Sequence, residues 1–85
     1  MEYVMNVTIK YFAMHRETAG CDREVVTMNE SGASPAQLYA DAVVRHGLTL
    51  DRSIVRPAIN GRYVSWDSSL SDGDEVVFIP PVSGG

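Results

Sequence analysis

The residues with the clearest chemical potential stand at the C-terminus, in "FIPPVSGG". Pro80 and Pro81 have φ angles fixed at about −65° and no N–H, so they predict a stiff, extended exit from the strand before them. Gly84 and Gly85 have no Cβ, and their backbone can pass through a slot too narrow for other residues. A terminal carboxylate is a poor electrophile. If a partner enzyme converted it to an acyl-adenylate with ATP, sulfur or an amine could attack it.

We therefore predict a flexible working tail over residues 80–85. In this interpretation Val82 and Ser83 contact the wall of a partner's channel, and Gly85 carries the reactive carboxyl group. The alternative is a frayed terminus that ends in two glycines by chance, since chain ends are commonly disordered. The tail residues alone leave both interpretations open.

Other candidate groups give weaker signals. His15 and His46 lie in separate helical segments without an acid or cysteine at metal-ligand spacing, so we expect both to be solvated polar residues. Cys21 lies among acids that would help little in ionising its thiol, and a lone cysteine cannot form an internal disulfide or hold a metal alone. The acids of "SDGDE" lack the ligand spacing and closing glutamate of a calcium loop. We expect no metal site.

Composition points to one globular domain spanning residues 1–85. The chain is 45% hydrophobic with a formal net charge of −4, which disfavours nucleic acid and anionic membranes as partners because both attract clustered Lys and Arg. The N-terminus lacks the basic start and apolar run of a signal peptide, and no stretch approaches the roughly 20 apolar residues of a transmembrane helix. We expect a cytoplasmic protein.

The elements that would hold the tail are readable from local patterns. Alternation of apolar and polar residues in "VMNVTIKYF" predicts a strand with one buried face. "AMHRETA" predicts a short helix from about residue 13 to 19 that ends at Gly20, and "REVVTM" predicts a second strand. The clearest helix follows Ser34, where Pro35 and Gln37 complete a capping box, and it ends at Gly47.

Strands follow this helix to the end of the chain. Asn60-Gly61 between two apolar runs predicts a type I′ hairpin turn. "SDGDEVVFIP" predicts a turn and a last strand that Pro80 and Pro81 close. The order of elements indicates an α+β fold of the β-grasp kind, with a mixed sheet packed on one main helix.

Strand parity predicts a partner surface beside the tail. Phe12, Tyr63 and Ile79 fall on faces that should be exposed to water, whereas Val64 and Trp66 should point inward. If the three converge, they form an apolar patch typical of protein interfaces, with Arg16 and Arg62 available at its rim. The alternative is three isolated exposed apolar residues and two solvated arginines, which are common on protein surfaces.

Two segments carry a family resemblance. "LSDGDEVVFIPPVSGG" fits the ending L-x-D-G-D-E-V…P-P-V-x-G-G, and "YFAMHRETAG" fits F-F-A-x-x-R-E-x-x-G, while "AINGRYVSWD" is similar to the central hairpin. Together they resemble the small subunit of molybdopterin synthase, a ubiquitin-like sulfur carrier of molybdenum cofactor biosynthesis. The resemblance runs from Ile9 to the terminus. The departures are a short extension over residues 1–3 and Trp66, where Phe is usual.

The resemblance implies a ubiquitin-like β-grasp fold and a division of labour with partners. An E1-like, ATP-dependent enzyme would adenylate Gly85, and a sulfur donor protein would convert it to a thiocarboxylate. The tail would then enter the large subunit, whose own residues perform catalysis, and deliver sulfur to cyclic pyranopterin monophosphate. Two transfers complete each pterin, and the assembly is a heterotetramer. The resemblance implies no bound cofactor. The alternatives are a related carrier for thiamine or tRNA thiolation, a protein modifier, or an interaction module with an inert tail.

Overall fold

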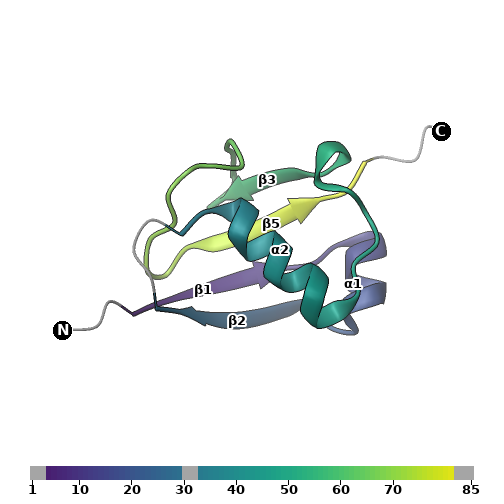
Figure 1. The fold of residues 1–85 in the computed structure, drawn as a ribbon, viewed down its shortest axis with the longest axis horizontal. Coiled ribbons are helices and arrows are strands. Elements are labelled where there is room, and N and C mark those ends of the chain that lie inside the picture. The colour runs from purple at the N-terminus through teal and green to yellow at the C-terminus, as the bar shows by residue number, and fades with distance from the viewer. Residues whose placement is uncertain (1–3, 30–32, 82–85) are drawn as a thin grey trace.

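The computed structural model describes residues 4–29 and 33–81 of the 85-residue chain. Within these ranges the chain forms one five-stranded sheet and two α-helices (Figure 1). The elements are β1 (Met5–Lys10), α1 (Ala13–Ala19), β2 (Arg23–Met28), α2 (Pro35–His46), a 3-10 helix η1 (Arg52–Ile54), β3 (Arg56–Ile59), β4 (Arg62–Tyr63) and β5 (Glu75–Ile79).

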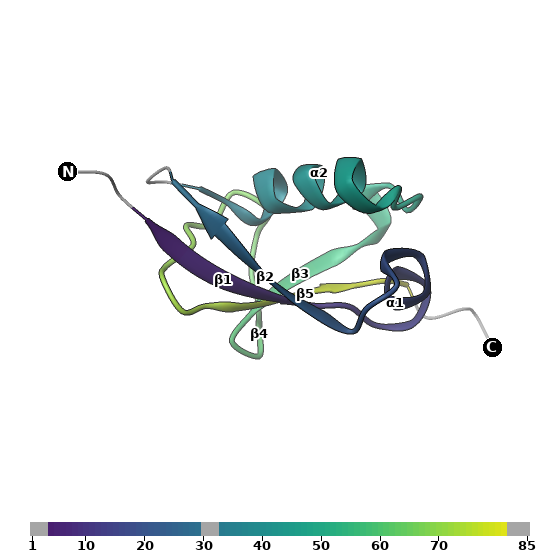
Figure 2. The same ribbon diagram turned by 90° about the horizontal axis from the view of Figure 1, so that it is seen from below.

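The sheet is mixed, in the strand order β2-β1-β5-β3-β4. β1 and β5 pair in parallel at the centre, whereas β2 pairs with β1, and β3 with both β5 and β4, in antiparallel fashion. α2 crosses one face of the sheet, and the other face carries no helix of the described chain (Figure 2). The predicted α+β architecture, a mixed sheet on one main helix, is confirmed.

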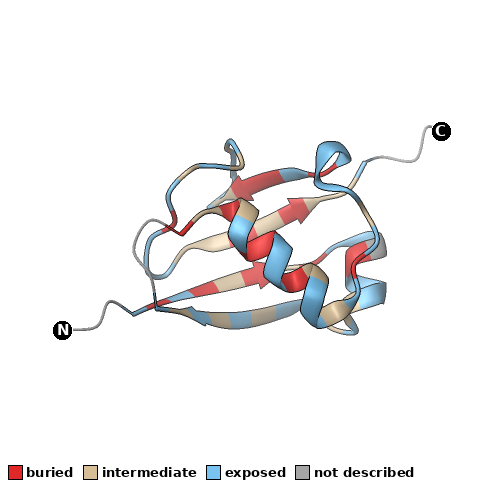
Figure 3. Cartoon of the chain, viewed as in Figure 1, coloured by how far each residue is buried: buried red, intermediate tan, exposed pale blue. Residues whose placement is uncertain are grey.

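Strand alternation builds the core beneath α2. Met5, Val7 and Ile9 of β1 and Val76 and Phe78 of β5 are fully buried, because side chains of period two on neighbouring strands point to the same face. The buried residues of α2, red in Figure 3, belong to the same core cluster. The aromatic rings gather at one point of this interface, where Tyr39 lies 4.8 Å and Trp66 5.9 Å from the ring of Phe78. The inward direction predicted for Trp66 is confirmed.

Local signals fixed the element ends. The side-chain oxygen of Ser34 accepts the backbone N–H of Gln37 at 3.3 Å, and the Gln37 side chain accepts the N–H of Ser34 at 3.0 Å, which completes the predicted capping box. Asn60 and Gly61 have φ angles of 51° and 85°, as a type I′ turn requires. Their loop sets Ala58 opposite Tyr63. The 3-10 helix η1 was not predicted from the sequence.

The capping box makes a testable contribution to stability. Replacing Ser34 with Ala removes the acceptor for an otherwise unpaired helix N–H and is expected to lower the free energy of unfolding by about 1 kcal/mol. The midpoint of thermal unfolding should fall by about 4–8 °C for a domain of this size. Ser71→Ala is the matched control, because the contacts of Ser71 with Asp74 use the backbone of Ser71. Equal stability of Ser34→Ala and Ser71→Ala would contradict the role of the cap.

Candidate functional site

The predicted tail begins at the C-terminal end of the central strand. β5 ends at Ile79, Pro80 is half-buried and Pro81 is exposed. Val82, Ser83, Gly84 and Gly85 lie outside the described residues, so the role assigned to them stays a prediction. The structure therefore fixes where the tail starts: at the end of the strand that lies between β1 and β3.

Three residues predicted to form a surface patch do converge. Phe12, from the turn before α1, Tyr63 from β4 and Ile79 from β5 line one open groove of about 230 Å³. Ala58, Gly61 and Val77 complete its lining. The groove lies on the sheet face opposite α2, because Val77 and Ile79 alternate with the buried Val76 and Phe78. The convergence that chain parity alone could not establish is present.

The exposure of these residues matches the prediction only in part. Tyr63 is 59% exposed and Phe12 46% exposed, but Ile79 is half-buried rather than exposed because it shares the groove with two larger aromatic rings. Phe12 is also not a strand residue, since β1 ends at Lys10 and Phe12 is the N-cap of α1. The result is an apolar groove with two aromatic rings open to a partner.

The cations near the groove are arranged differently from the prediction. Arg16 and Arg62 are exposed, on α1 and β4, and neither lines the groove. The guanidinium of Arg56, which sequence reasoning missed, lies 4.1 Å from the centre of the Tyr63 ring. Such a contact holds an aromatic ring in place by cation–π attraction. The hairpin register could have predicted this contact. A two-residue turn at Asn60-Gly61 sets Ala58 opposite Tyr63, and Arg56 lies two residues before Ala58, on the same face of the sheet.

The prediction that both histidines are solvated is wrong. His15 is 1% exposed, with Nδ1 3.0 Å from the carbonyl oxygen of Phe78 and Nε2 3.0 Å from the Tyr39 hydroxyl. Burial lowers the pKa of His15, against a smaller opposing effect of the Phe78 carbonyl. His46 is half-buried, and its Nε2 lies 2.9 Å from a carboxylate oxygen of Glu24. Both rings have protein partners because the helices that carry them pack on the sheet.

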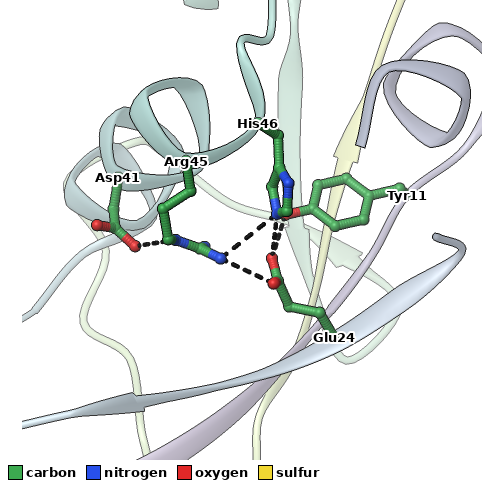
Figure 4. Close-up of polar contacts among 5 residues, drawn as sticks. All are labelled: Tyr11, Glu24, Asp41, Arg45 and His46. Carbon is green, nitrogen blue, oxygen red and sulfur yellow. Dashed lines mark hydrogen bonds and ion pairs between the residues drawn. The ribbon is translucent and has the colours of Figure 1, made fainter. Parts of the chain in front are cut away.

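Glu24 is the centre of a polar cluster between β2 and α2 (Figure 4). Its Oε1 accepts the Tyr11 hydroxyl at 2.7 Å, and its Oε2 accepts Nη1 of Arg45 at 2.7 Å. Nε of Arg45 in turn donates to Asp41 at 2.7 Å. Partial burial alone would raise the pKa of Glu24, but hydrogen bonds from Arg45, Tyr11 and His46 outweigh it and hold the pKa at about 2. The cluster connects an edge strand to the end of α2.

The described residues contain neither a metal-binding group nor a membrane-spanning helix. Among residues 4–29 and 33–81, no group of three or more His, Cys, Asp or Glu side chains is arranged to hold a metal ion. None of the helices in these ranges has the length and apolar character needed to cross a bilayer.

A family comparison decides the relationship. The sequence model of the ThiS family matches residues 9–85, from the last two residues of β1 through the Gly-Gly end. The chain belongs to the ThiS family. The match includes the groove residues Phe12, Tyr63 and Ile79, every element after β1, and the predicted tail.

Individual relatives of this ThiS-family chain cover nearly its whole length. It is 38% identical to the molybdopterin synthase sulfur carrier subunit of Escherichia coli, over 93% of this chain and 99% of that protein. A solved putative molybdopterin converting factor, subunit 1, from Pyrococcus furiosus is 40% identical, with a TM-score of 0.77 over 92% of this chain and 99% of that one. The resemblance stated from the sequence and the ubiquitin-like β-grasp fold are both confirmed.

A more distant structure shares the fold in a complex. A protein–protein complex of subunits 1 and 2 of molybdopterin-converting factor from Helicobacter pylori contains a chain that is 22% identical, with a TM-score of 0.65. The alignment covers 95% of this ThiS-family chain and 100% of that one. At this level of identity the likeness establishes the fold alone.

The Glu24 cluster predicts how the stability of this ThiS-family domain responds to acid. The folded pKa of about 2, below the reference value of 4.5, means that the charged carboxylate stabilises the fold above about pH 5 and that this contribution is lost as pH falls toward 2. The difference in unfolding free energy between wild type and Glu24→Gln should shrink by about 3 kcal/mol over this range. Denaturant titrations at several pH values measure it.

Glu17→Gln is the control for this measurement, because it removes one carboxylate from the exposed face of α1, outside the cluster. It reports the effect of net charge alone. For each variant, the difference in unfolding free energy from wild type is followed against pH. If this difference varies with pH in the same way for Glu24→Gln and Glu17→Gln, the hydrogen bonds to Glu24 do not stabilise its charged form.

Proposed function

We propose that this chain is the sulfur-carrier subunit of a molybdopterin synthase and that Gly85 carries the transferred sulfur. The observation that carries the proposal is the alignment with the Escherichia coli sulfur carrier subunit across 93% of this chain, together with a family match that extends through Gly85. The arrangement of the groove beside the start of the tail supports it.

The chemistry would use the terminal carboxylate in two steps. A carboxylate oxygen of Gly85 attacks the α-phosphorus of ATP in an E1-like enzyme, which forms the acyl-adenylate and releases pyrophosphate. A persulfide sulfur of a donor protein then attacks the carbonyl carbon and displaces AMP, and reductive cleavage of the resulting acyl disulfide by a thiol leaves the thiocarboxylate. The nucleotide belongs to the activating enzyme, so the carrier itself needs no bound cofactor.

The sulfur would then pass to cyclic pyranopterin monophosphate inside the large subunit of the synthase. The described residues of this chain include no acid–base pair beside the start of the tail, and we place the residues that bind the substrate and move protons on the partner. The absence of side chains at Gly84 and Gly85 suits a narrow channel. Two carriers on a large-subunit dimer, a heterotetramer in the cytoplasm, would deliver the two sulfurs.

The geometry of the groove supports docking next to the tail. Ile79 lines the groove and is also the last residue of β5, directly before Pro80. A partner that covers Phe12, Tyr63 and Ile79 therefore sits where the chain leaves the sheet. Tyrosine is among the residue types enriched at the few positions that carry most of the binding energy in protein interfaces, which favours Tyr63 as the main contact. Arg16 and Arg62 would then contact acidic groups at the edge of the partner.

Deletion of Gly85 tests the reacting group. The chain lacking Gly85, and a chain with one added residue after it, should fold with the unfolding midpoint of wild type but form no thiocarboxylate. After incubation with activating enzyme, ATP and sulfur donor, intact-mass spectrometry should show the exchange of one oxygen for one sulfur only in wild type. Sulfur loading of the shortened chain would overturn the proposal.

The same incubation separates the rival functions. Delivery of sulfur to cyclic pyranopterin monophosphate by the loaded chain, in the presence of the large subunit, is the expected result. Delivery only to a thiamine precursor or to tRNA would indicate a related carrier, and isopeptide-linked conjugates on lysines would indicate a protein modifier. A C-terminal tag that leaves all partner reactions intact would indicate an inert tail.

A charge placed in the groove tests the docking surface. Tyr63→Glu should raise the Kd for the large subunit by at least about tenfold, because truncating or charging a central aromatic residue of an interface commonly costs more than 1 kcal/mol. Val44→Glu is the matched control, since Val44 is 84% exposed on α2, on the opposite face of the sheet. Calorimetric titration measures both. Equal weakening by the two changes would reflect added negative charge and would contradict docking in the groove.

A further inference from the structure

The end of the last strand has a gap in its backbone hydrogen bonding. The parallel pairing of β1 with β5 runs from Thr8↔Glu75 to Lys10↔Val77 and reaches no further. On the other side, Pro57 lies opposite Phe78, but its backbone faces β4, where its carbonyl oxygen accepts the amide of Val64 at 3.1 Å, so β3 offers no donor to Phe78. The carbonyl of Phe78 is therefore the first β5 acceptor beyond the reach of either neighbouring strand. It is fully buried, and a buried carbonyl without a partner costs free energy.

The side chain of His15 occupies this gap. Its Nδ1 lies 3.0 Å from the carbonyl oxygen of Phe78, in a buried contact between α1 and β5. Both views of the ribbon place α1 beside the C-terminal end of β5 (Figures 1 and 2). A carbonyl oxygen can only accept, so Nδ1 carries a proton and acts in place of the strand amide that β1 does not supply.

Tyr39 fixes the other side of the ring. Its hydroxyl lies 3.0 Å from Nε2 of His15 and 2.8 Å from the carbonyl oxygen of Leu50. Burial favours the neutral imidazole, so Nε2 is an acceptor and the single hydroxyl proton of Tyr39 is shared between Nε2 and the Leu50 carbonyl. The rings also meet edge to face, with centroids 5.6 Å apart. The imidazole is therefore held in one orientation and one tautomer.

Only Ile79 separates the Phe78 carbonyl from the two prolines. Ile79 pairs with Arg56 of β3, whereas Pro80 and Pro81 have no N–H and restricted φ angles. A stiff proline segment transmits the direction in which it starts. The orientation of the Phe78 peptide thus sets the direction in which the chain leaves the sheet.

We propose that His15 is a positioning residue for the C-terminal tail: by donating from Nδ1 to the Phe78 carbonyl, it fixes the direction in which Pro80 and Pro81 leave β5. This role rests on the proposed function, because direction matters only if a partner receives the tail. His15 takes no part in the acyl chemistry. It acts through Phe78, and it lowers the cost of presenting the tail by ordering its start before the partner binds.

Two substitutions separate this role from simple core packing. His15→Asn keeps an N–H donor at the place of Nδ1 and loses the contact with Tyr39, whereas His15→Gln keeps a polar group at the place of Nε2 and loses the donor to Phe78. Both remove the ring, so both should lower the midpoint of thermal unfolding. Only His15→Gln should leave the Phe78 carbonyl without a donor and so let the direction of Ile79, Pro80 and Pro81 vary.

The first measurement reads the direction of the tail without any partner. Residual dipolar couplings of Ile79, Pro80 and Pro81 relative to the sheet should stay near their wild-type values in His15→Asn and shrink in His15→Gln. Nitrogen-15 spectra of the wild-type ring should show Nδ1 protonated and Nε2 bare. A ring protonated at Nε2 alone, or equal couplings in the two variants, would overturn the proposal, and the ring spectrum remains decisive if a variant fails to fold.

The second measurement uses the activating enzyme. For adenylation of the chain, His15→Gln should raise KM by about tenfold with kcat nearly unchanged, because it leaves a buried carbonyl without its donor, and His15→Asn should raise KM by less than about threefold. A loss in both variants that follows their unfolding midpoints would indicate a purely structural role and contradict the proposal. If wild type is not adenylated at all, the proposed function fails, while the dipolar couplings still decide whether His15 orients the strand end.

Discussion

The parallel pairing of β1 with β5 is the constraint on which the rest of the domain depends. It brings the first strand of the chain beside the last and sets β5 between β1 and β3. Parallel neighbours cannot be joined by a tight turn, so the intervening chain has room to form α2, which covers one face of the sheet. The opposite face stays open for the groove. The predicted tail therefore starts from a strand that is paired on both sides, instead of from an edge strand.

This placement makes one strand serve two surfaces. Val76 and Phe78 of β5 face α2 and are fully buried, whereas Val77 and Ile79 line the groove. Because the side-chain period of a strand is two, a slip of one residue in the register would turn Val77 and Ile79 toward the core and Val76 and Phe78 toward the groove. The aromatic contacts of Phe78 with Tyr39 and Trp66 oppose such a slip. Packing beneath α2 thus fixes the register that presents the groove on the other side.

The features that could be predicted from the sequence are local ones. The alternation of β1, the cap at Ser34 and the Asn60-Gly61 turn each depend on residues within a few positions of one another, and all three are confirmed. The contacts that sequence reasoning missed join distant elements: Nδ1 of His15 meets a carbonyl 63 residues away, and Glu24 collects donors from β1's end and α2. Sequence alone does not show which face of a helix packs on the sheet, so a histidine without nearby ligands is predicted to be solvated. For this reason the prediction was wrong for both His15 and His46.

The turn into α1 connects the groove with the end of β5. Ala13 has a φ angle of 50°, a left-handed conformation that costs a non-glycine residue roughly 1–2 kcal/mol. Phe12 stands before it and lines the groove, while His15 stands after it and reaches the Phe78 carbonyl. The carbonyl of Phe12 also accepts the amide of His15 at 3.1 Å. The contacts of Phe12 and His15 on either side of Ala13 hold this turn in its left-handed conformation. The docking proposed at Phe12 and the tail orientation proposed for His15 therefore depend on the same turn.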